Sequence, residues 1–193
     1  IAEGDGPART LLDAMGMWEE GAGLGRGATP VQHLADALGA APFLLAHVND
    51  VTDTDIEALA RSGAHVVWCP RCRRYFGHDA TVGRHRWRDM LRAGINVAVG
   101  TDSIINLPDQ ARASRPRISP LDDLRLLHAE GDGDDPRLLL SLATTRAATP
   151  LGMDSSLFTL APGRTAGLAI VEVGGMRPDG DPARSVLGAT GDV

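Results

Sequence analysis

The stretch LLAHVNDVTDTDIEALARSGAHVVWCP, residues 44–70, contains the pattern that decides the fold. Continuous apolar runs stand at its two ends, over 42–48 and 64–70, and the segment between them has apolar residues at helical spacing. Continuous rather than alternating runs are typical of parallel strands that are covered on both faces. The stretch therefore predicts a strand, a helix and a second strand parallel to the first.

Capping residues support the helix in this unit. Thr52 or Asp53 suits the N-cap, because a short polar side chain there accepts a hydrogen bond from a free backbone N–H. Ile56 and Leu59 fall on one face, and Gly63 tolerates the left-handed backbone that ends a helix. We therefore expect a helix between the cap and Gly63.

The same unit repeats along the chain. INVAVGTD, over 95–102, predicts a third buried strand, and helices are predicted over 29–41, 85–94, about 119–129 and about 136–148. A polar loop is predicted over 108–118, and an alternating strand outside this rhythm over 162–173. Alternating β and α units are typical of a doubly wound sheet or a (β/α) barrel. No glycine-rich phosphate loop follows any of the three strands, which argues against a nucleotide-binding fold.

Composition limits the expected partners. The chain has 193 residues, and its 19 basic residues, all Arg, stand against 25 acidic ones, for a net charge of −6. This balance argues against nucleic acid or an anionic membrane as a partner, and the absence of Lys excludes a lysine Schiff base. With two cysteines and no apolar stretch of membrane-spanning length, we expect a cytoplasmic protein. Because the chain starts at Ile1 without Met, we also expect a piece of a longer polypeptide.

Reactive side chains follow the predicted strands at the ends where α/β enzymes place their active sites. His47 ends the first run, Cys69 the second and Asp102 the third. His47 and Asp102 would thus face one site, although each also has a structural interpretation: a hydrogen-bonded histidine, and an aspartate that caps the following turn. Glu3, in IAEGDG, is a further candidate, at the end of a fourth strand.

Both cysteines lie in WCPRC, which is typical of a redox dithiol or of half a zinc site. A reactive dithiol has its first cysteine at the start of a helix, but Pro70 follows Cys69 directly, and RRYFGHD has no apolar helical period. A structural zinc site would need two more ligands in a matching pair, and no such pair is present. We therefore interpret this segment as a strand end and a loop that border a pocket.

Five motifs occur in order: a strand ending in His47, the CPRC strand end, GINVAVGTD, ATTRAATPLG and PGRTAGL. In this order and spacing, from about residue 1 to 185, the chain resembles the C-terminal half of a metal-dependent amidohydrolase. The resemblance is greatest to the branch of cytosine deaminases, S-adenosylhomocysteine and methylthioadenosine deaminases and chlorohydrolases.

The resemblance implies an α/β fold, the C-terminal half of a (β/α)8 TIM barrel with strands 5/6 to 8. Residues 1–160 would form the partial barrel, and residues 161–193 would supply a short return strand of an accessory β-sandwich. Half a barrel leaves strand edges open and apolar core uncovered, so we expect association, for example as a homo-oligomer.

The resemblance also implies a hydrolase of carbon–nitrogen bonds other than peptides, most of all a deaminase of a small purine-, pyrimidine- or triazine-like ring. One divalent metal, zinc or iron, would be held by Asp102, with His47 as a second ligand or a hydrogen-bond partner of the attacking oxygen. Glu3 would shuttle a proton to the ring and to the leaving ammonia. The alternative is a non-catalytic half-barrel, an interaction module that needs a complementing N-terminal half.

The chain departs from the family in its metal ligands. The H-x-H pair of the first strand and the histidine of the fifth strand are absent, so Asp102 and His47 would be the only family ligands. We therefore expect the isolated chain to carry negligible metal.

The loop after the second predicted strand also differs from the family pattern. Trp68 stands where the family usually has His, and Cys72 where it has Ser. A cationic, partly aromatic rim is predicted from Arg71, Arg73, Arg74, Tyr75 and His78. Of these, Arg71, Arg74 and His78 are predicted to contact substrate, with a solvated loop as the alternative.

Overall fold

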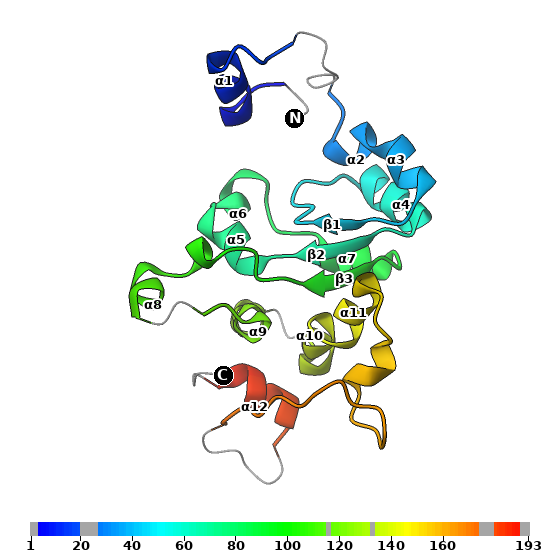
Figure 1. The fold of residues 1–193 in the computed structure, drawn as a ribbon, viewed down its shortest axis with the longest axis vertical. Coiled ribbons are helices and arrows are strands. Elements are labelled where there is room, and N and C mark those ends of the chain that lie inside the picture. The colour runs from blue at the N-terminus through cyan, green and yellow to red at the C-terminus, as the bar shows by residue number, and fades with distance from the viewer. Residues whose placement is uncertain (1–3, 20–26, 115–116, 132–133, 174–179, 190–193) are drawn as a thin grey trace.

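The computed structural model describes residues 4–19, 27–114, 117–131, 134–173 and 180–189. At its centre lies a parallel sheet in the order β1-β2-β3, made of β1 (Leu44–Ala46), β2 (His65–Trp68) and β3 (Asn96–Val99) (Figure 1). In the register of this sheet, Val66 pairs with Leu45 on one side and with Val97 on the other. The predicted parallel arrangement is confirmed, and the strands end at a common edge.

The helix α4 (Asp53–Ser62) connects β1 to β2 and begins at a capping box. The Thr52 side chain accepts a hydrogen bond from the Asp55 N–H, and the Asp55 carboxylate accepts one from the Thr52 N–H at 2.9 Å. Because these bonds satisfy N–H groups that the first turn leaves unpaired, Thr52 rather than Asp53 is the N-cap. Gly63 ends the helix in the left-handed region with φ 71°, as predicted.

Three short helices connect β2 to β3: α5 (Pro70–Tyr75), α6 (His78–Thr81) and α7 (Trp87–Arg92). The sequence predicts α7 but not α5, and its interpretation of the residues after Cys69 as a loop is wrong. Pro70 occupies the first turn, where its fixed φ suits a helix, and the helix buries Cys72 and Arg73. Tertiary packing therefore stabilises a helix that the local pattern does not indicate.

The hydrophobic core lies on one face of the sheet. Val66 and Val97 point into it, where they join Leu59 of α4 and Met90 of α7, and all four side chains are fully buried. The helices α9 (Pro120–Glu130) and α10 (Pro136–Leu142) complete the core with four leucines: Leu124, Leu127, Leu139 and Leu142. Each such burial contributes roughly 1.5–3 kcal/mol, so the core fixes the strands against the helices.

The opposite face of the sheet is partly open. The register places Ala46, Val67 and Ala98 on it, and of these only Ala98 is buried. Leu44, on the edge strand β1, is 45% exposed. Coverage of both faces is thus not observed among the described residues. In a barrel the inner face is filled by side chains from the strands opposite, and the described residues contain no such strands.

Several helices differ from the predicted ranges. The helix predicted over 29–41 is two helices, α2 (Pro30–His33) and α3 (Ala35–Ala40), because Leu34 leaves the helical region at φ −96° and ψ 8°. The helix predicted over 136–148 is likewise divided into α10 and α11 (Thr145–Ala148). The predicted polar loop contains α8 (Asp109–Ser114), which buries no residue and so lacks the apolar face that reveals a helix in a sequence.

The remaining elements are α1 (Pro7–Ala14), α12 (Pro182–Gly188) and three 3-10 turns, η1 (Ile104–Asn106), η2 (Thr149–Leu151) and η3 (Ser155–Phe158). Figure 1 shows α9, α10 and α11 below β3, and α12 beneath them. Leu187 of α12 belongs to the same hydrophobic core as the sheet. Part of the segment assigned to a β-sandwich, 161–193, is thus a helix that shares the hydrophobic core of the sheet. No helix among the described residues is both long and apolar enough to cross a bilayer.

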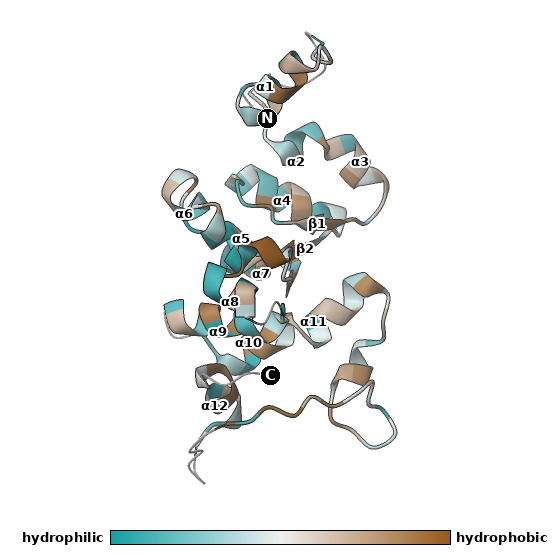
Figure 2. Ribbon diagram, turned by 60° about the vertical axis from the view of Figure 1, so that its left-hand side comes forward, coloured by the Kyte–Doolittle hydropathy of each residue, from teal (hydrophilic) through white to brown (hydrophobic). Residues whose placement is uncertain are grey.

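The strand predicted over 162–173 is not formed by the described residues. They contain only an isolated antiparallel bridge between Ala161 and Arg164. Leu168 and Ile170 are 76% and 92% exposed, and Figure 2 shows hydrophobic residues along this extended segment. A strand needs a neighbour to accept its backbone hydrogen bonds, and no described strand lies beside this one. The division into a barrel and a β-sandwich stays a prediction.

Candidate functional site

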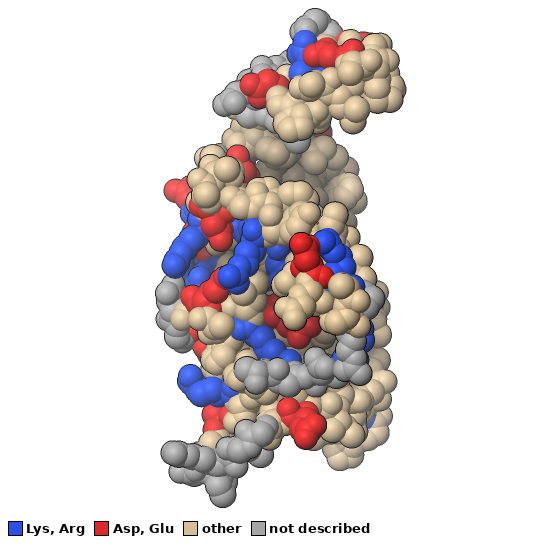
Figure 3. Space-filling model, turned by 90° about the vertical axis from the view of Figure 1, so that its left-hand side faces the viewer, with Lys and Arg blue, Asp and Glu red and all other residues tan. Residues whose placement is uncertain are grey.

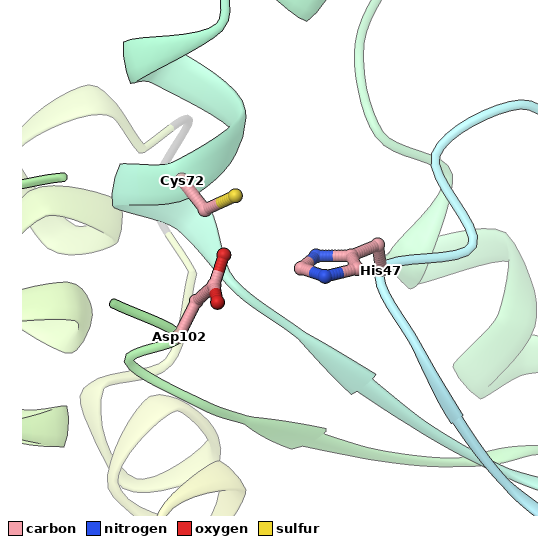
Figure 4. Close-up of side chains that lie close together, drawn as sticks. All are labelled: His47, Cys72 and Asp102. Atoms are coloured by element: carbon pink, nitrogen blue, oxygen red, sulfur yellow. The ribbon is translucent and has the colours of Figure 1, made fainter. Parts of the chain in front are cut away.

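Three side chains from different elements converge at the carboxyl edge of the sheet (Figure 4). His47 follows β1, Asp102 follows β3, and Cys72 lies on α5 after β2. A ring nitrogen, a carboxylate oxygen and the Cys72 Sγ all lie within 4.8 Å of one another. The structure thus brings His47 and Asp102 together and adds Cys72, which the sequence places only at the wall of the pocket. Glu3 lies outside the described residues.

The backbone at this edge is unusual. Among the described residues, His47, Val48 and Asp102 are the non-glycine residues with positive φ, at 67°, 49° and 56°. This region costs an L-residue about 1–3 kcal/mol, and a β-branched residue such as Val48 adopts it least readily. Such conformations cluster at functional sites, where the surrounding structure maintains them. Two of the three residues are those that the sequence assigns to the site.

The backbone of His47 is held from both sides. Its N–H donates to the Val67 carbonyl at 2.8 Å. Its own carbonyl oxygen lies 2.7 Å from Nε2 of His85, and because a carbonyl only accepts, Nε2 carries the proton. Burial lowers the pKa of His85 to about 4, so this imidazole is neutral, and it stacks on the Trp68 ring at 4.7 Å. No motif in the sequence indicates His85, which stands 38 positions after His47.

The Asp102 carboxylate is hydrogen-bonded within the site. The Cys72 thiol donates to it, and this bond is the main cause that lowers the pKa of Asp102. Asn106 Nδ2 donates to the same carboxylate at 3.4 Å, while the buried Asn106 Oδ1 has no hydrogen-bond partner. Asp102 is therefore ionised at neutral pH, with two donors directed at it.

Gly100 allows β2 and β3 to approach closely just before Asp102. A Cβ at this position would lie 2.9 Å from Cγ2 of Val67 and 3.3 Å from Sγ of Cys69. In protein structures a Cβ atom essentially never lies within 3 Å of a non-bonded heavy atom. A side chain at this position would therefore displace the strand end. The glycine of GTD thus has a packing role at the site.

The two thiols are not those of a reactive dithiol. Cys69 does stand at the start of a helix, contrary to the expectation from the sequence. Burial, however, raises the pKa of Cys69 to about 11 and that of Cys72 to about 12. A dithiol that reacts at neutral pH needs the opposite shift. The raised pKa values of both thiols therefore argue against an oxidoreductase, although for a different reason than the one the sequence suggests.

Arg71, predicted to contact substrate, ties α5 to α9. Its Nε and Nη2 donate to Asp123 Oδ2 at 2.9 and 2.6 Å, and its backbone N–H donates to Oδ1 at 3.1 Å. Asp123 is fully buried, and Arg71 Nη2 also donates to the Ser119 carbonyl at 3.1 Å. The guanidinium therefore satisfies a buried carboxylate, and its contact to substrate stays a prediction.

The other two rim residues also have protein partners. Arg74 pairs with Glu130 at 3.1 Å on the surface, and His78 Nδ1 lies 3.0 Å from the Asn49 side chain. Figure 3 shows basic and acidic side chains interspersed on the face of the molecule that it views. The assignment of Arg74 and His78 to substrate binding stays a prediction.

Comparison with known proteins decides the family. The sequence matches the Amidohydrolase family over residues 13–190, most of its length. The chain belongs to the amidohydrolase family. The predicted resemblance is thereby confirmed.

Several relatives of this amidohydrolase are deaminases. It is 36% identical over 117 residues to the aminodeoxyfutalosine deaminase of Deinococcus radiodurans, which covers 60% of this chain and 25% of the relative. It is 32% identical over 154 residues to the 5-methylthioadenosine/S-adenosylhomocysteine deaminase of Halobacterium salinarum, with 76% of this chain and 32% of the relative covered. This amidohydrolase thus spans about a third or less of the length of these relatives.

A solved structure agrees with the sequence comparison. An atrazine chlorohydrolase of Arthrobacter aurescens TC1, complexed with zinc and atraton, superposes with a TM-score of 0.65 at 27% identity. The alignment covers 85% of this amidohydrolase and 36% of the chlorohydrolase. The mixed α/β arrangement around a small parallel sheet is therefore shared with an amidohydrolase of known structure.

Proposed function

We propose that this amidohydrolase hydrolyses a carbon–nitrogen bond of a small purine-, pyrimidine- or triazine-like ring and releases ammonia. The observation that carries the proposal is the convergence of His47 and Asp102 at the carboxyl edge of a parallel sheet in a member of this family. Deaminases of adenosine derivatives and a triazine hydrolase among its relatives support this substrate class. They favour a hydrolase over the non-catalytic interaction module.

A single divalent cation fits the donors at this edge. A histidine nitrogen and a carboxylate oxygen are ligands of zinc and iron, and Asp102 is ionised at neutral pH because hydrogen bonds lower its pKa. The buried, unpaired Oδ1 of Asn106 beside them marks a polar environment that is incompletely satisfied without a further group. We propose that Asp102 and His47 hold this cation, zinc or iron. When bound, such a cation lowers the pKa of water toward neutrality and so supplies a nucleophile for hydrolysis.

The side chains then have separate roles. The Asp102 carboxylate accepts the proton of the attacking water, and the His47 imidazole serves as the second ligand of the cation. Glu3 is proposed to carry a proton to the ring and to the leaving ammonia. The His85–His47 hydrogen bond keeps the His47 side chain directed at Asp102.

The surroundings of the site support two further expectations. Exposed apolar side chains at the β1 edge, including Phe43 and Leu44 at 40% and 45%, favour association through that edge, for example into a homo-oligomer or with the rest of a TIM barrel. The net charge of −6 argues against a nucleic-acid or anionic-membrane partner. We propose a cytoplasmic enzyme with a small-molecule substrate, the class on which its deaminase relatives act.

Ammonia release from 5-methylthioadenosine, S-adenosylhomocysteine and an aminotriazine by the full-length protein tests the proposal. Asp102→Asn and His47→Asn should each reduce kcat by about 10²–10⁴-fold, the usual contribution of a general base or acid. The matched control Asp36→Asn changes an exposed carboxylate on α3 and should stay within about twofold of wild type, as a distant surface change does. Full activity of Asp102→Asn, or no ammonia from any of these rings with a folded, zinc-loaded protein, would contradict the proposal.

A further inference from the structure

We propose that Cys72 is a third metal ligand, whose thiolate forms a His–Cys–Asp donor set with His47 and Asp102. The inference rests on the proposed function, since it concerns the same site. It extends that function, because the family pattern has Ser at this position and predicts only His47 and Asp102 as ligands within this chain.

The first observation is geometric. The Cys72 Sγ, a nitrogen of His47 and an oxygen of Asp102 lie within 4.8 Å of one another, and Figure 4 shows the three side chains directed at a common point. Ligand atoms around a tetrahedral zinc are roughly 3.5 Å apart, so closing the set requires side-chain movements of about 1 Å. No change in the positions of β1, β3 or α5 is needed.

The second observation is that α5 holds Cys72 in place. Cys72 is 4% exposed, and the residues on either side of it are anchored by ion pairs. Arg71 pairs with the buried Asp123, and Arg73 donates to Asp79 at 2.6 Å and to Asn49 Oδ1 at 3.0 Å. A thiol anchored this way is preorganised toward the other two donors.

The third observation is an independent polar group at the same place. Asn106 is 7% exposed, its Nδ2 donates to Asp102, and its Oδ1 is buried without a partner. Buried amide oxygens are almost always hydrogen-bonded, so an unpaired one on a residue that contacts Asp102 indicates that the polar groups around the site are incompletely satisfied. An ion with its water ligands would supply a hydrogen-bond partner.

Binding of a metal ion by Cys72 releases the thiol proton. In the metal-free protein Cys72 carries its thiol proton. When a divalent ion binds, the sulfur–hydrogen bond breaks, the proton leaves to solvent, and the sulfur electron pair forms the bond to the ion. A thiolate is a soft ligand, which favours zinc and its spectroscopic substitute cobalt over magnesium, calcium or manganese. The donor set thus favours zinc over iron, the two metals that the family pattern leaves open.

Cobalt(II) titration of the purified full-length protein, in a phosphine reductant, tests the proposal without any assay of activity. The expectation of negligible metal concerned the isolated chain with two ligands. Wild type should develop the near-ultraviolet charge-transfer band of a thiolate bound to cobalt and release about one proton per ion. Cys72→Ser should lose the band and bind cobalt at least about tenfold more weakly. Cys69→Ser, which removes the neighbouring buried thiol, should keep both the band and the affinity, and thermal melting confirms that each variant is folded.

The outcomes separate the inference from the proposed function. A band that persists in Cys72→Ser, cobalt bound by wild type without a band, or no cobalt binding at all would overturn the role of Cys72. If the band depends on Cys72 while the full-length protein releases no ammonia from any of the rings, the ligand assignment stands and the proposed function fails. If deamination depends on Asp102 but the band is absent, the function stands and the inference fails.

Discussion

The Nε2 atom of His85 lies 2.7 Å from the carbonyl oxygen of His47. His47 has φ 67°, and the next residue, Val48, has φ 49°. A buried imidazole before α7 thus holds a left-handed turn at the end of β1, from which the His47 side chain reaches Asp102. His85 acts on the site through the backbone carbonyl of His47, and it is therefore a positioning residue.

Removing the hydrogen bond from His85 should destabilise the fold and the site together. His85→Phe leaves the His47 carbonyl without its donor, and the expected cost is about 1–3 kcal/mol in the free energy of unfolding. His85→Gln, the matched control, places an amide N–H near the position of Nε2 and should recover much of this loss. Urea denaturation measures both, and cobalt affinity reports the site. Equal stability of the two variants would show that the hydrogen bond is not needed.

The metal-free protein should lose stability as the pH falls from about 6.5 to 4. Burial lowers the pKa of His85 in the folded state from its ordinary 6.5 to about 4, so over this range the unfolded chain binds more protons. Stability therefore rises with pH through this window and is greatest above it, with an upper limit of about 3 kcal/mol from this group. Urea unfolding in a chelating buffer between pH 4 and 7 measures the slope. His85→Gln should have a shallower slope, and an unchanged slope would assign the effect to other groups.

Gly100→Ala should be destabilising through a steric contact. The added methyl would lie 2.9 Å from Val67 Cγ2, and overpacking of this kind costs about 1–3 kcal/mol. Gly39→Ala is the control, because Gly39 lies within α3 with open space around its Cβ position. There Ala should be neutral or stabilising by about 0.5–1 kcal/mol. Thermal melting measures the stability of both variants. Equal melting temperatures would contradict the packing role of Gly100.

Asp123→Ala should be far more damaging than Glu130→Gln. The first substitution leaves Arg71, 11% exposed, without its carboxylate, which typically costs 3–5 kcal/mol. The second breaks the surface pair of Glu130 with Arg74, which is worth about 0–1 kcal/mol. Chemical denaturation compares the two variants. A loss of unfolding free energy below about 1 kcal/mol for Asp123→Ala would show that Arg71 does not need this ion pair. Its predicted contact to substrate would then gain support.

Much of the central unit is encoded locally. The three strands, α4 with its Thr52 cap, and α7 follow from apolar periodicity and capping residues, which act between neighbours in the chain. Because parallel strands end at one edge, the positions of His47 and Asp102 at strand ends were enough to predict that they meet. Their role in binding a metal stays a prediction.

Other features depend on contacts between distant segments. The helix α5 forms although its sequence has no apolar period, because its buried residues pack against elements that the local pattern does not contain. The segment 162–173 has the alternating pattern of a strand, yet its described residues form none, because a strand requires a hydrogen-bonding neighbour. In both segments the contacts with neighbouring elements, and not the local sequence pattern, decide the secondary structure.

The amino-acid sequence by itself determined the parallel β-α order, the family resemblance and two of the side chains at the site. These are properties of spacing along the chain. Only the tertiary structure decided that Cys72 joins His47 and Asp102, that His85 supports His47, and that Arg71 is held by Asp123. Each of these depends on a distance of a few ångströms between residues at least 25 positions apart, and such distances exist only once the core has positioned the strands and helices.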